Sequence, residues 1–289
     1  NLGVALDRSG EREKAIAHFE KAIAIKPDYI DAAFNLGLAH FRLATDEHLR
    51  AAEAQFQRVL TLKPDSPDAE FHLGEIYYQR GRTTRALRLY KKALESRPDD
   101  ARTYRRMARA YMDQGEPKVA VGYLERLVVL APDDADAHRQ LGIALAAIGT
   151  SDSFERAIDE LRHAQKLDPE SPEILVSLAE VHLRGKQVDK ARQVLRSALE
   201  LDPASRAAAL ALGDLLESTN DLDGAQKTYE ASLERNPTFA EAQYRIGRLY
   251  RRKNDRAREC AHYEKALALN PGHVLARVEL GLDAREVGV

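Results

Sequence analysis

The chain has 289 residues, of which 44% are hydrophobic and 31% are charged, a composition typical of a folded protein and unlike that of a disordered one. Lys and Arg number 44 against 46 Asp and Glu, so the net charge of −2 gives no overall attraction to nucleic acid or to an anionic membrane. The single cysteine, Cys260, excludes an internal disulfide framework and a thiolate zinc cluster.

No stretch of the sequence approaches the roughly 20 apolar residues that a membrane-spanning helix needs, so we expect no direct membrane insertion. The chain begins at Asn1 rather than at Met, and it does so in the middle of a pattern. We therefore expect both ends to be cut from a longer protein, and we recognise no targeting segment. A cytoplasmic location is the preferred interpretation, with the periplasm as the alternative.

Eight prolines recur along the chain at near-constant intervals. Five of the seven intervals are 34 residues, and the two that begin at Pro27 and Pro132 are 37. A fixed period of this size indicates one small structural unit copied end to end. The full series is Pro27, Pro64, Pro98, Pro132, Pro169, Pro203, Pro237 and Pro271.

Other residues keep a fixed distance from these prolines. With each proline at repeat position 32, position 8 is always Gly or Ala, and position 20 is Ala except at Glu259 in the last complete unit. Position 27 is mostly Ala, and position 24 is always large and apolar or aromatic, from Phe19 to Tyr263. Small residues let two helices approach closely, and a large residue fills the wedge beside them.

Each unit is predicted to contain two helices. Apolar residues recur at three- and four-residue spacing, with a turn signal between the two runs, as in Gln114-Gly115-Glu116. The proline follows the second helix, and a signal such as Ser66-Pro67 starts the next first helix. We place the three extra residues of the two longer units in the turn between their helices, around residues 44–50 and 150–153.

This pattern resembles the tetratricopeptide repeat family over the whole chain. The resemblance implies an all-α fold, an α-α superhelix or right-handed solenoid of stacked helix-turn-helix repeats, as a single domain. Two departures are Glu259 at a small position and the absence of the family's tryptophan at position 4. The expected repeats are about 1–29 (incomplete), 30–66, 67–100, 101–134, 135–171, 172–205, 206–239 and 240–273. A final first helix is expected in 274–289, from Val274 to about Glu286.

In this family the first helices line the concave face, and partners bind there. One helix is predicted to show a basic stripe on that face, because its four arginines are spaced i, i+3, i+4 and i+7. Two interpretations stay open: the stripe binds an acidic peptide or another anion, or it forms ion pairs with nearby carboxylates. The stripe is Arg102, Arg105, Arg106 and Arg109, joined by Arg139 of the next unit, and the carboxylates are Asp68, Glu75, Asp113 and Asp136.

A second basic cluster is a secondary candidate, formed by Arg245, Arg248 and Arg252 with Arg251 between them. Acidic residues on the same face are about as numerous as these arginines. A structural or solvated role is therefore preferred over binding. These acids are Asp214, Glu217, Glu241, Glu279 and Glu286.

Aromatic side chains are predicted next to the basic stripe. Phe34, Phe41, Phe71 and Tyr78 occupy groove positions of two first helices, so we expect an exposed aromatic patch of the kind that contacts partners, with burial as the alternative. Asn35 matches the position-6 asparagines with which the O-linked N-acetylglucosamine transferase superhelix holds peptide backbone. Asn1 matches as well, but the row then continues as His72, Arg106 and Gln140.

Motifs for catalysis or cofactor binding are absent from the sequence. The nine histidines contain no i, i+3 or i, i+4 pair, so we predict no metal, no cofactor, no catalytic residues and no enzyme in this segment. The predicted function is a protein–protein interaction scaffold that binds an extended, partly acidic partner segment in its groove, and no nucleic acid. One alternative is the substrate-recognition arm of a larger enzyme such as a glycosyltransferase. The other is a self-assembling structural repeat protein.

Overall fold

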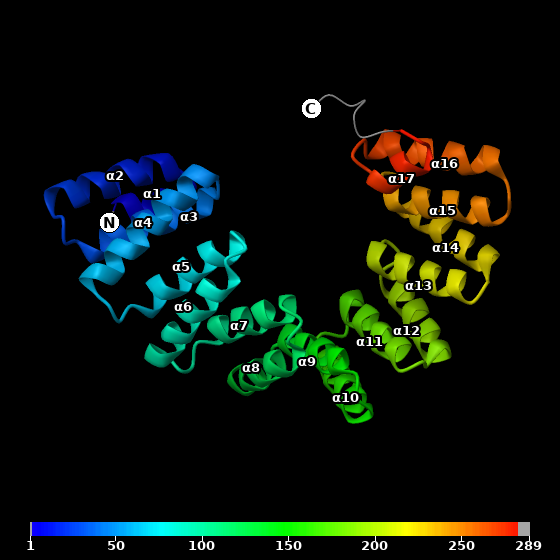
Figure 1. The fold of residues 1–289 in the computed structure, drawn as a ribbon, viewed down its shortest axis with the longest axis horizontal. Helices are drawn as coiled ribbons and strands as arrows, with labels where there is room; N and C mark the ends of the chain where they lie inside the picture. Colours follow the sequence, from blue (N-terminus) through cyan, green and yellow to red (C-terminus); the bar gives the residue numbers. More distant parts are fainter. Residues whose placement is uncertain (1, 283–289) are drawn as a thin grey trace. The chain divides into compact units, whose positions relative to one another are not determined.

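The computed structural model describes residues 2–282, and within them all regular secondary structure is helical. The chain divides into two compact units, Asn1–Pro132 and Asp133–Val289. In the ribbon of Figure 1 the helices of each unit follow one another in chain order. The helices of the first unit are α1 (Leu2–Arg8), α2 (Arg12–Ile25), α3 (Ile30–Leu43), α4 (Asp46–Leu62), α5 (Pro67–Gln79), α6 (Thr83–Ser96), α7 (Ala101–Asp113) and α8 (Pro117–Leu130).

The second unit continues the alternation of first and second helices. Odd-numbered helices are the first helices of their repeats, and even-numbered helices are the second. The helices of this unit are α9 (Ala135–Ile148), α10 (Ser151–Leu167), α11 (Pro172–Arg184), α12 (Val188–Leu201), α13 (Arg206–Ser218), α14 (Leu222–Arg235), α15 (Ala240–Arg252), α16 (Arg256–Leu269) and α17 (Val274–Glu279).

The predicted contact between a small and a large residue holds the two helices of a repeat together. At Gly74 on α5, an added Cβ would lie 2.6 Å from the Tyr90 ring of α6, and at Gly37 on α3 it would lie 2.8 Å from Phe56 of α4. Both rings are fully buried. Only glycine leaves room for rings this close, because real Cβ atoms do not approach other atoms to such distances.

The two longer units differ from the sequence-based prediction. Helices α4 and α10 have 17 residues each, whereas α6 and α8 have 14. The prediction that the extra residues lengthen the connecting turn is wrong: they add a turn to the start of the second helix. Thr45 and Thr150 start these helices early, because each hydroxyl accepts a hydrogen bond from the backbone N–H three residues ahead.

The last described repeat accommodates its unusual residue. Glu259 on α16 is 3% exposed, and its carboxylate pairs at 2.6 Å with Arg256, so α15 and α16 still pack together. Cys260 beside it is half-buried. Helix α17 ends at Glu279, and the backbone then turns at Gly281 with φ +71°, whereas the sequence predicts a helix to about Glu286. Glu286 itself, like Asn1, lies outside the described residues.

Candidate functional site

The basic stripe lies on α7, and three of its guanidinium groups are open to solvent. The side chains of Arg102, Arg106 and Arg109 are 52%, 45% and 67% exposed, and Arg105 is half-buried. Each of the three exposed arginines forms an ion pair with a carboxylate. The pairs join Arg102 to Asp68 at 2.9 Å and to Asp100 at 3.0 Å, Arg106 to Glu75 at 2.9 Å, and Arg109 to Asp113 at 3.1 Å.

Two of these carboxylates are buried beneath the arginines. The side chains of Glu75 and Asp100 are both 7% exposed. Glu75 also accepts a hydrogen bond from the phenol of Tyr90, a fully buried residue of α6. Burial raises the pKa of Tyr90, and the charge of Glu75 raises it further, so the phenol keeps its proton and donates it. The Glu75 carboxylate that pairs with Arg106 is therefore itself held in place by the Tyr90 phenol.

Asp68 of α5 links the stripe to the preceding repeat. Both nitrogens of the Arg97 fork donate to its carboxylate, at 3.0 and 2.8 Å, and Arg102 donates to it as well. The hydrogen bonds from Arg97, with those from Arg102, lower the pKa of Asp68 from 3.8 to about 2. Asp68 is therefore ionised throughout the physiological pH range and holds two arginines in place.

The aromatic residues form a cluster around His72 rather than an exposed patch. The His72 ring stacks on Phe56 at 5.5 Å between ring centres and meets Phe34, Phe41 and Phe71 edge-on at 5.2–5.9 Å. Phe71 is 7% exposed, whereas Phe34 and Phe41 are half-buried. The expected exposed patch is not present, and the alternative of burial holds for Phe71, because His72 fills the space between the rings.

His72 itself is a half-buried histidine, one of whose nitrogens has no hydrogen-bond partner. Its Nδ1 atom is buried and makes no hydrogen bond. Burial lowers the pKa of His72 to about 4, and the charge of Arg102 acts in the same direction, so the ring is neutral near pH 7. A neutral imidazole is compatible with an apolar site enclosed by phenylalanines.

The structure joins the aromatic cluster to the basic stripe at two points. The guanidinium carbon of Arg102 lies 5.0 Å from the centre of the Phe71 ring, a cation–π contact. At the other end of α7, the half-buried Tyr78 donates its phenol to Asp113, the partner of Arg109. The expected neighbourhood of aromatic and basic side chains is therefore present in the first unit.

Two other predicted residues have local partners. Asn35 on α3 donates from its side-chain amide to the backbone carbonyl of Asp31 at 2.7 Å. Arg139 belongs to the second unit, where it lies on α9 and pairs with Asp136 at 2.5 Å. The four carboxylates that the sequence offered as partners of the arginines all take part in such pairs.

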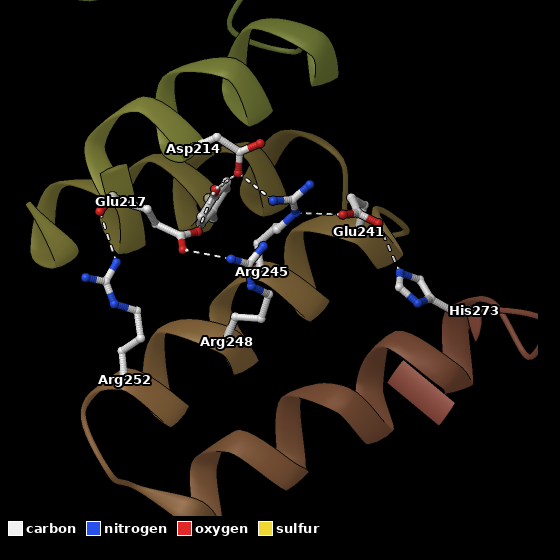
Figure 2. Close-up of polar contacts among 8 residues, drawn as sticks. Asp214, Glu217, Glu241, Arg245, Arg248, Arg252 and His273 are labelled. Carbon is white, nitrogen blue, oxygen red and sulfur yellow. Dashed lines mark hydrogen bonds and ion pairs between the residues drawn. The ribbon is translucent and has the colours of Figure 1, made fainter. Parts of the chain in front are cut away.

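The second basic cluster lies on α15 of the second unit and is more enclosed by acids. Figure 2 shows Arg245 between two carboxylates, with Asp214 of α13 at 2.6 Å and Glu241 at 2.7 Å. Arg248 pairs more loosely with Glu217, at 3.6 Å. Two further contacts complete the group: Arg252 donates to the Glu217 carbonyl at 3.0 Å, and His273 lies 3.0 Å from Glu241.

The two basic surfaces share an arrangement that the sequence analysis missed. In the second unit the buried phenol of Tyr229 donates to Asp214 and Glu217, at 3.0 and 3.1 Å, just as Tyr90 donates to Glu75 in the first. Both cases combine a tyrosine at repeat position 24, an acid at position 9 and an arginine at position 6 of the next repeat. The same three residue types occur at these positions twice in the sequence, and this recurrence could have revealed the arrangement.

Family models for the tetratricopeptide repeat match almost the whole chain. One model, described as tetratricopeptide repeat, matches residues 78–143, 151–215 and 186–249, and others match 3–43, 43–101 and 240–273. The chain belongs to the tetratricopeptide repeat family. Proteins of this family generally act as non-catalytic scaffolds for protein interaction. No curated protein sequence matches the chain significantly.

Several solved structures share this tetratricopeptide fold. A tetratricopeptide repeat protein from Parabacteroides merdae has a TM-score of 0.63 and 16% identity, over 91% of this chain and 98% of its own. Yeast Tom70 has a TM-score of 0.63 and 17% identity, over 95% of this chain and 60% of its own. PilF of Pseudomonas aeruginosa has a TM-score of 0.53 and 24% identity, over 75% of this chain and 97% of its own. At these identities the likeness concerns the fold.

Among residues 2–282, no helix combines the length and the apolar character that a membrane span requires. The same part of the chain contains no group of three or more His, Cys, Asp or Glu side chains arranged to hold a metal ion.

Proposed function

We propose that this tetratricopeptide protein is an interaction scaffold whose first unit binds an extended, partly acidic partner segment along α3, α5 and α7. The observation that supports the proposal is the contrast in exposure on α7. Arg106 is 45% exposed while its partner Glu75 is 7% exposed, and Arg102 is 52% exposed while Asp100 is 7% exposed. The buried carboxylates fix the arginines, and the guanidinium groups face outward.

An arginine that is already paired can still bind a second carboxylate. The guanidinium group carries five N–H donors in a planar fork, and one carboxylate occupies at most two of them. Arginines held in place by buried acids also lose less side-chain entropy when a partner binds. The half-buried rings of Phe34 and Phe41 supply an adjacent apolar surface for the uncharged side chains of the same segment.

The test uses a fluorescent peptide that alternates Glu or Asp with Leu, and a second peptide with Gln and Asn in place of the acids. Fluorescence anisotropy should show binding of the acidic peptide that weakens as salt is added, and weaker binding of the amide peptide. Replacing Arg105 and Arg109 together by Gln should lower the affinity for the acidic peptide roughly three- to tenfold. Each ion pair that an arginine forms with the peptide at the protein surface contributes about 0.2–1 kcal/mol. Arg106 is left in place because it neutralises the buried Glu75.

The matched control replaces Arg248 and Arg252 of the second unit by Gln, since Arg248 occupies the same repeat position as Arg109. It also carries Glu217→Gln, so that the buried carboxylate that pairs with Arg248 is not left without a counter-charge. This variant should bind the acidic peptide like the unmodified chain. Equal losses in the two variants, or no loss in either, would contradict the proposal, provided that circular dichroism shows both variants folded.

A further inference from the structure

The two repeats with long second helices differ in one pair of side chains. In the first of them, His40 near the end of α3 faces His48 in the added first turn of α4, with their Nδ1 atoms 2.9 Å apart and their ring centres 5.1 Å apart. In the second, the same positions are Leu145 on α9 and Ser153 on α10. The two histidines are eight residues apart and lie on different helices, so the i, i+3 and i, i+4 spacings of a single helix do not reveal the pair.

The backbone of this turn does not depend on the histidines. The hydroxyl of Thr45 accepts a hydrogen bond from the His48 backbone N–H at 3.3 Å, and Thr150 does the same for Ser153 at 3.2 Å. The residue before each threonine, Ala44 or Gly149, has a positive φ in both repeats. The histidine pair is thus an addition to a turn that the other repeat forms without it.

We propose that His40 and His48 bind a divalent transition-metal ion, with Cu²⁺ as the preferred ion. Imidazole nitrogen is a suitable ligand for Cu, Ni and Zn, and Cu²⁺ binds most tightly among the divalent first-row metals. Both histidines are half-buried, so solvent reaches the pair and can supply the remaining ligands as water. This proposal departs from the sequence-based prediction of no metal, and it is independent of the function proposed above.

The distance between the two nitrogens favours a particular geometry. With metal–nitrogen bonds of about 2.05 Å, a separation of 2.9 Å corresponds to an N–metal–N angle of about 90°. Two neighbouring positions of a square-planar or tetragonal ion meet at that angle, whereas tetrahedral zinc would need the nitrogens about 3.3 Å apart. The separation of the two nitrogens therefore suits Cu²⁺ or Ni²⁺ better than tetrahedral Zn²⁺, and binding needs the rings to turn so that both Nδ1 lone pairs face the ion.

Protons and charge are consistent with metal binding. In the free protein, one Nδ1 donates a hydrogen to the other. When the ion binds, that proton moves to Nε2 of the same ring, so both Nδ1 lone pairs face the metal and no net proton is released. The carboxylates of Glu20 and Glu47 interact electrostatically with His40, and the same negative charge stabilises a bound cation.

The test titrates the full chain with Cu²⁺ in a buffer that contains glycine as a weak competitor. Calorimetry should find a site that is lost when His40→Leu and His48→Ser are combined, which copies Leu145 and Ser153 of the other long repeat. The affinity for Cu²⁺ should fall at least roughly ten- to hundredfold, because the loss of a single residue that supports a metal ligand already has an effect of this size. His18→Ser removes an exposed histidine of the same unit and should leave this site intact.

A measurement on the unmodified chain keeps the proposal open to refutation if the double variant does not fold. Electron paramagnetic resonance should show two imidazole nitrogens in the Cu²⁺ plane, and substoichiometric Cu²⁺ should broaden the NMR signals of His40 and His48 first. A single imidazole nitrogen, broadening that begins at other histidines, or unchanged affinity in a folded double variant would each overturn the proposal.

Discussion

The α5–α7 face of the first unit and the α13–α15 face of the second use the same residue positions with opposite exposure. In the first unit the arginine is open, since Arg106 is 45% exposed and its partner Glu75 is 7% exposed. In the second unit the arginine is the more covered member, since Arg245 is 21% exposed and Asp214 is 45% exposed. At this pair of positions the first face presents a guanidinium group to solvent and the second presents a carboxylate, although Arg248 of the second face is also 40% exposed beside Glu217, which is 6% exposed.

The difference arises from the residue at position 2 of the arginine-bearing helix. On α15 this residue is Glu241, which holds Arg245 from the side opposite Asp214 (Figure 2). On α7 it is Arg102, so no second carboxylate covers Arg106 from that position. A single exchange of acid for base at this position thus distinguishes the two similar surfaces, and the one that carries the base is the surface proposed above to bind an acidic segment.

The largest expected effect concerns the packing beneath the two faces. A Cβ added at Gly213 would lie 2.2 Å from the Tyr229 ring and 2.6 Å from its hydroxyl, whereas at Gly74 the nearest atom of Tyr90 is 2.6 Å away. Gly213→Ala should lower the free energy of unfolding by about 3 kcal/mol, because it crowds the ring and disturbs its hydrogen bonds to Asp214 and Glu217. Gly74→Ala should cost about 1–2 kcal/mol, since the contact is with the ring alone.

Urea unfolding followed by circular dichroism measures both variants. Gly122→Ala on α8 is the control, because its Cβ would meet nothing within 4 Å. This control should gain up to about 1 kcal/mol from the helix propensity of alanine. If Gly74→Ala proves the more damaging change, the second face is not the more tightly packed one.

A smaller effect is expected from removing the arginines themselves. Arg106→Gln leaves the buried carboxylate of Glu75 with the Tyr90 phenol as its remaining partner, and should cost about 2 kcal/mol, less than a fully buried pair because Arg106 is half exposed. Arg245→Gln leaves the more exposed Asp214 to water and should cost about 1 kcal/mol or less.

A double-mutant cycle separates the cost of leaving a buried charge without a partner from the other losses of stability. Adding Glu75→Gln to Arg106→Gln should recover most of the lost stability, because no buried charge is left without a partner. Thermal and urea unfolding of the four proteins give the coupling. Equal costs at Arg106 and Arg245, with no recovery in the double variant, would show that exposure does not distinguish the two pairs.

The contacts that recur from repeat to repeat were predictable from the sequence, whereas features confined to single repeats were not. Contacts between a small residue at position 8 and a large residue at position 24, such as Gly74 with Tyr90 and Gly142 with Leu161, recur along the chain, so spacing alone indicated them. The start of α4 at Asp46 was missed because Thr45 caps the helix through local hydrogen bonding, which the repeat pattern does not contain.

Side-chain partners between repeats were the hardest to predict. The sequence offered Glu75 as one of several acids for Arg106, but the burial of Glu75 depends on how the Tyr90 phenol reaches it from α6. The rings around His72 were expected on the surface because their repeat positions face the groove in the family. Whether a neighbouring side chain fills the space between such rings depends on its size and direction, which position numbers do not give.

The smallest expected effect is a dependence of the free energy of unfolding on low pH, and we expect it from the α5–α7 face alone. Asp68 on α5 has its pKa lowered to about 2 by hydrogen bonds from Arg97 and then Arg102, whereas the corresponding position on α13 is Ala207. The ion pairs of Asp68 should contribute fully above its ordinary pKa of 3.8 and be lost as the pH falls toward 2. Because the Asp68 side chain is 38% exposed, solvent screens these pairs, and we expect them to contribute less than about 1 kcal/mol to the free energy of unfolding.

Carbon-detected NMR of the Asp68 carboxyl measures this directly, without requiring the two units to unfold separately. The midpoint should lie well below 3.8, and Arg97→Gln should raise it more than Arg102→Gln, because Arg97 donates through both arms of its fork. Asp68→Asn should flatten the loss of thermal stability between pH 4 and pH 2. A midpoint near 3.8 in the unmodified chain would mean that Asp68 does not hold Arg102 in place, and the fixed arginines of the first face would then depend on Glu75, Asp100 and Asp113 alone.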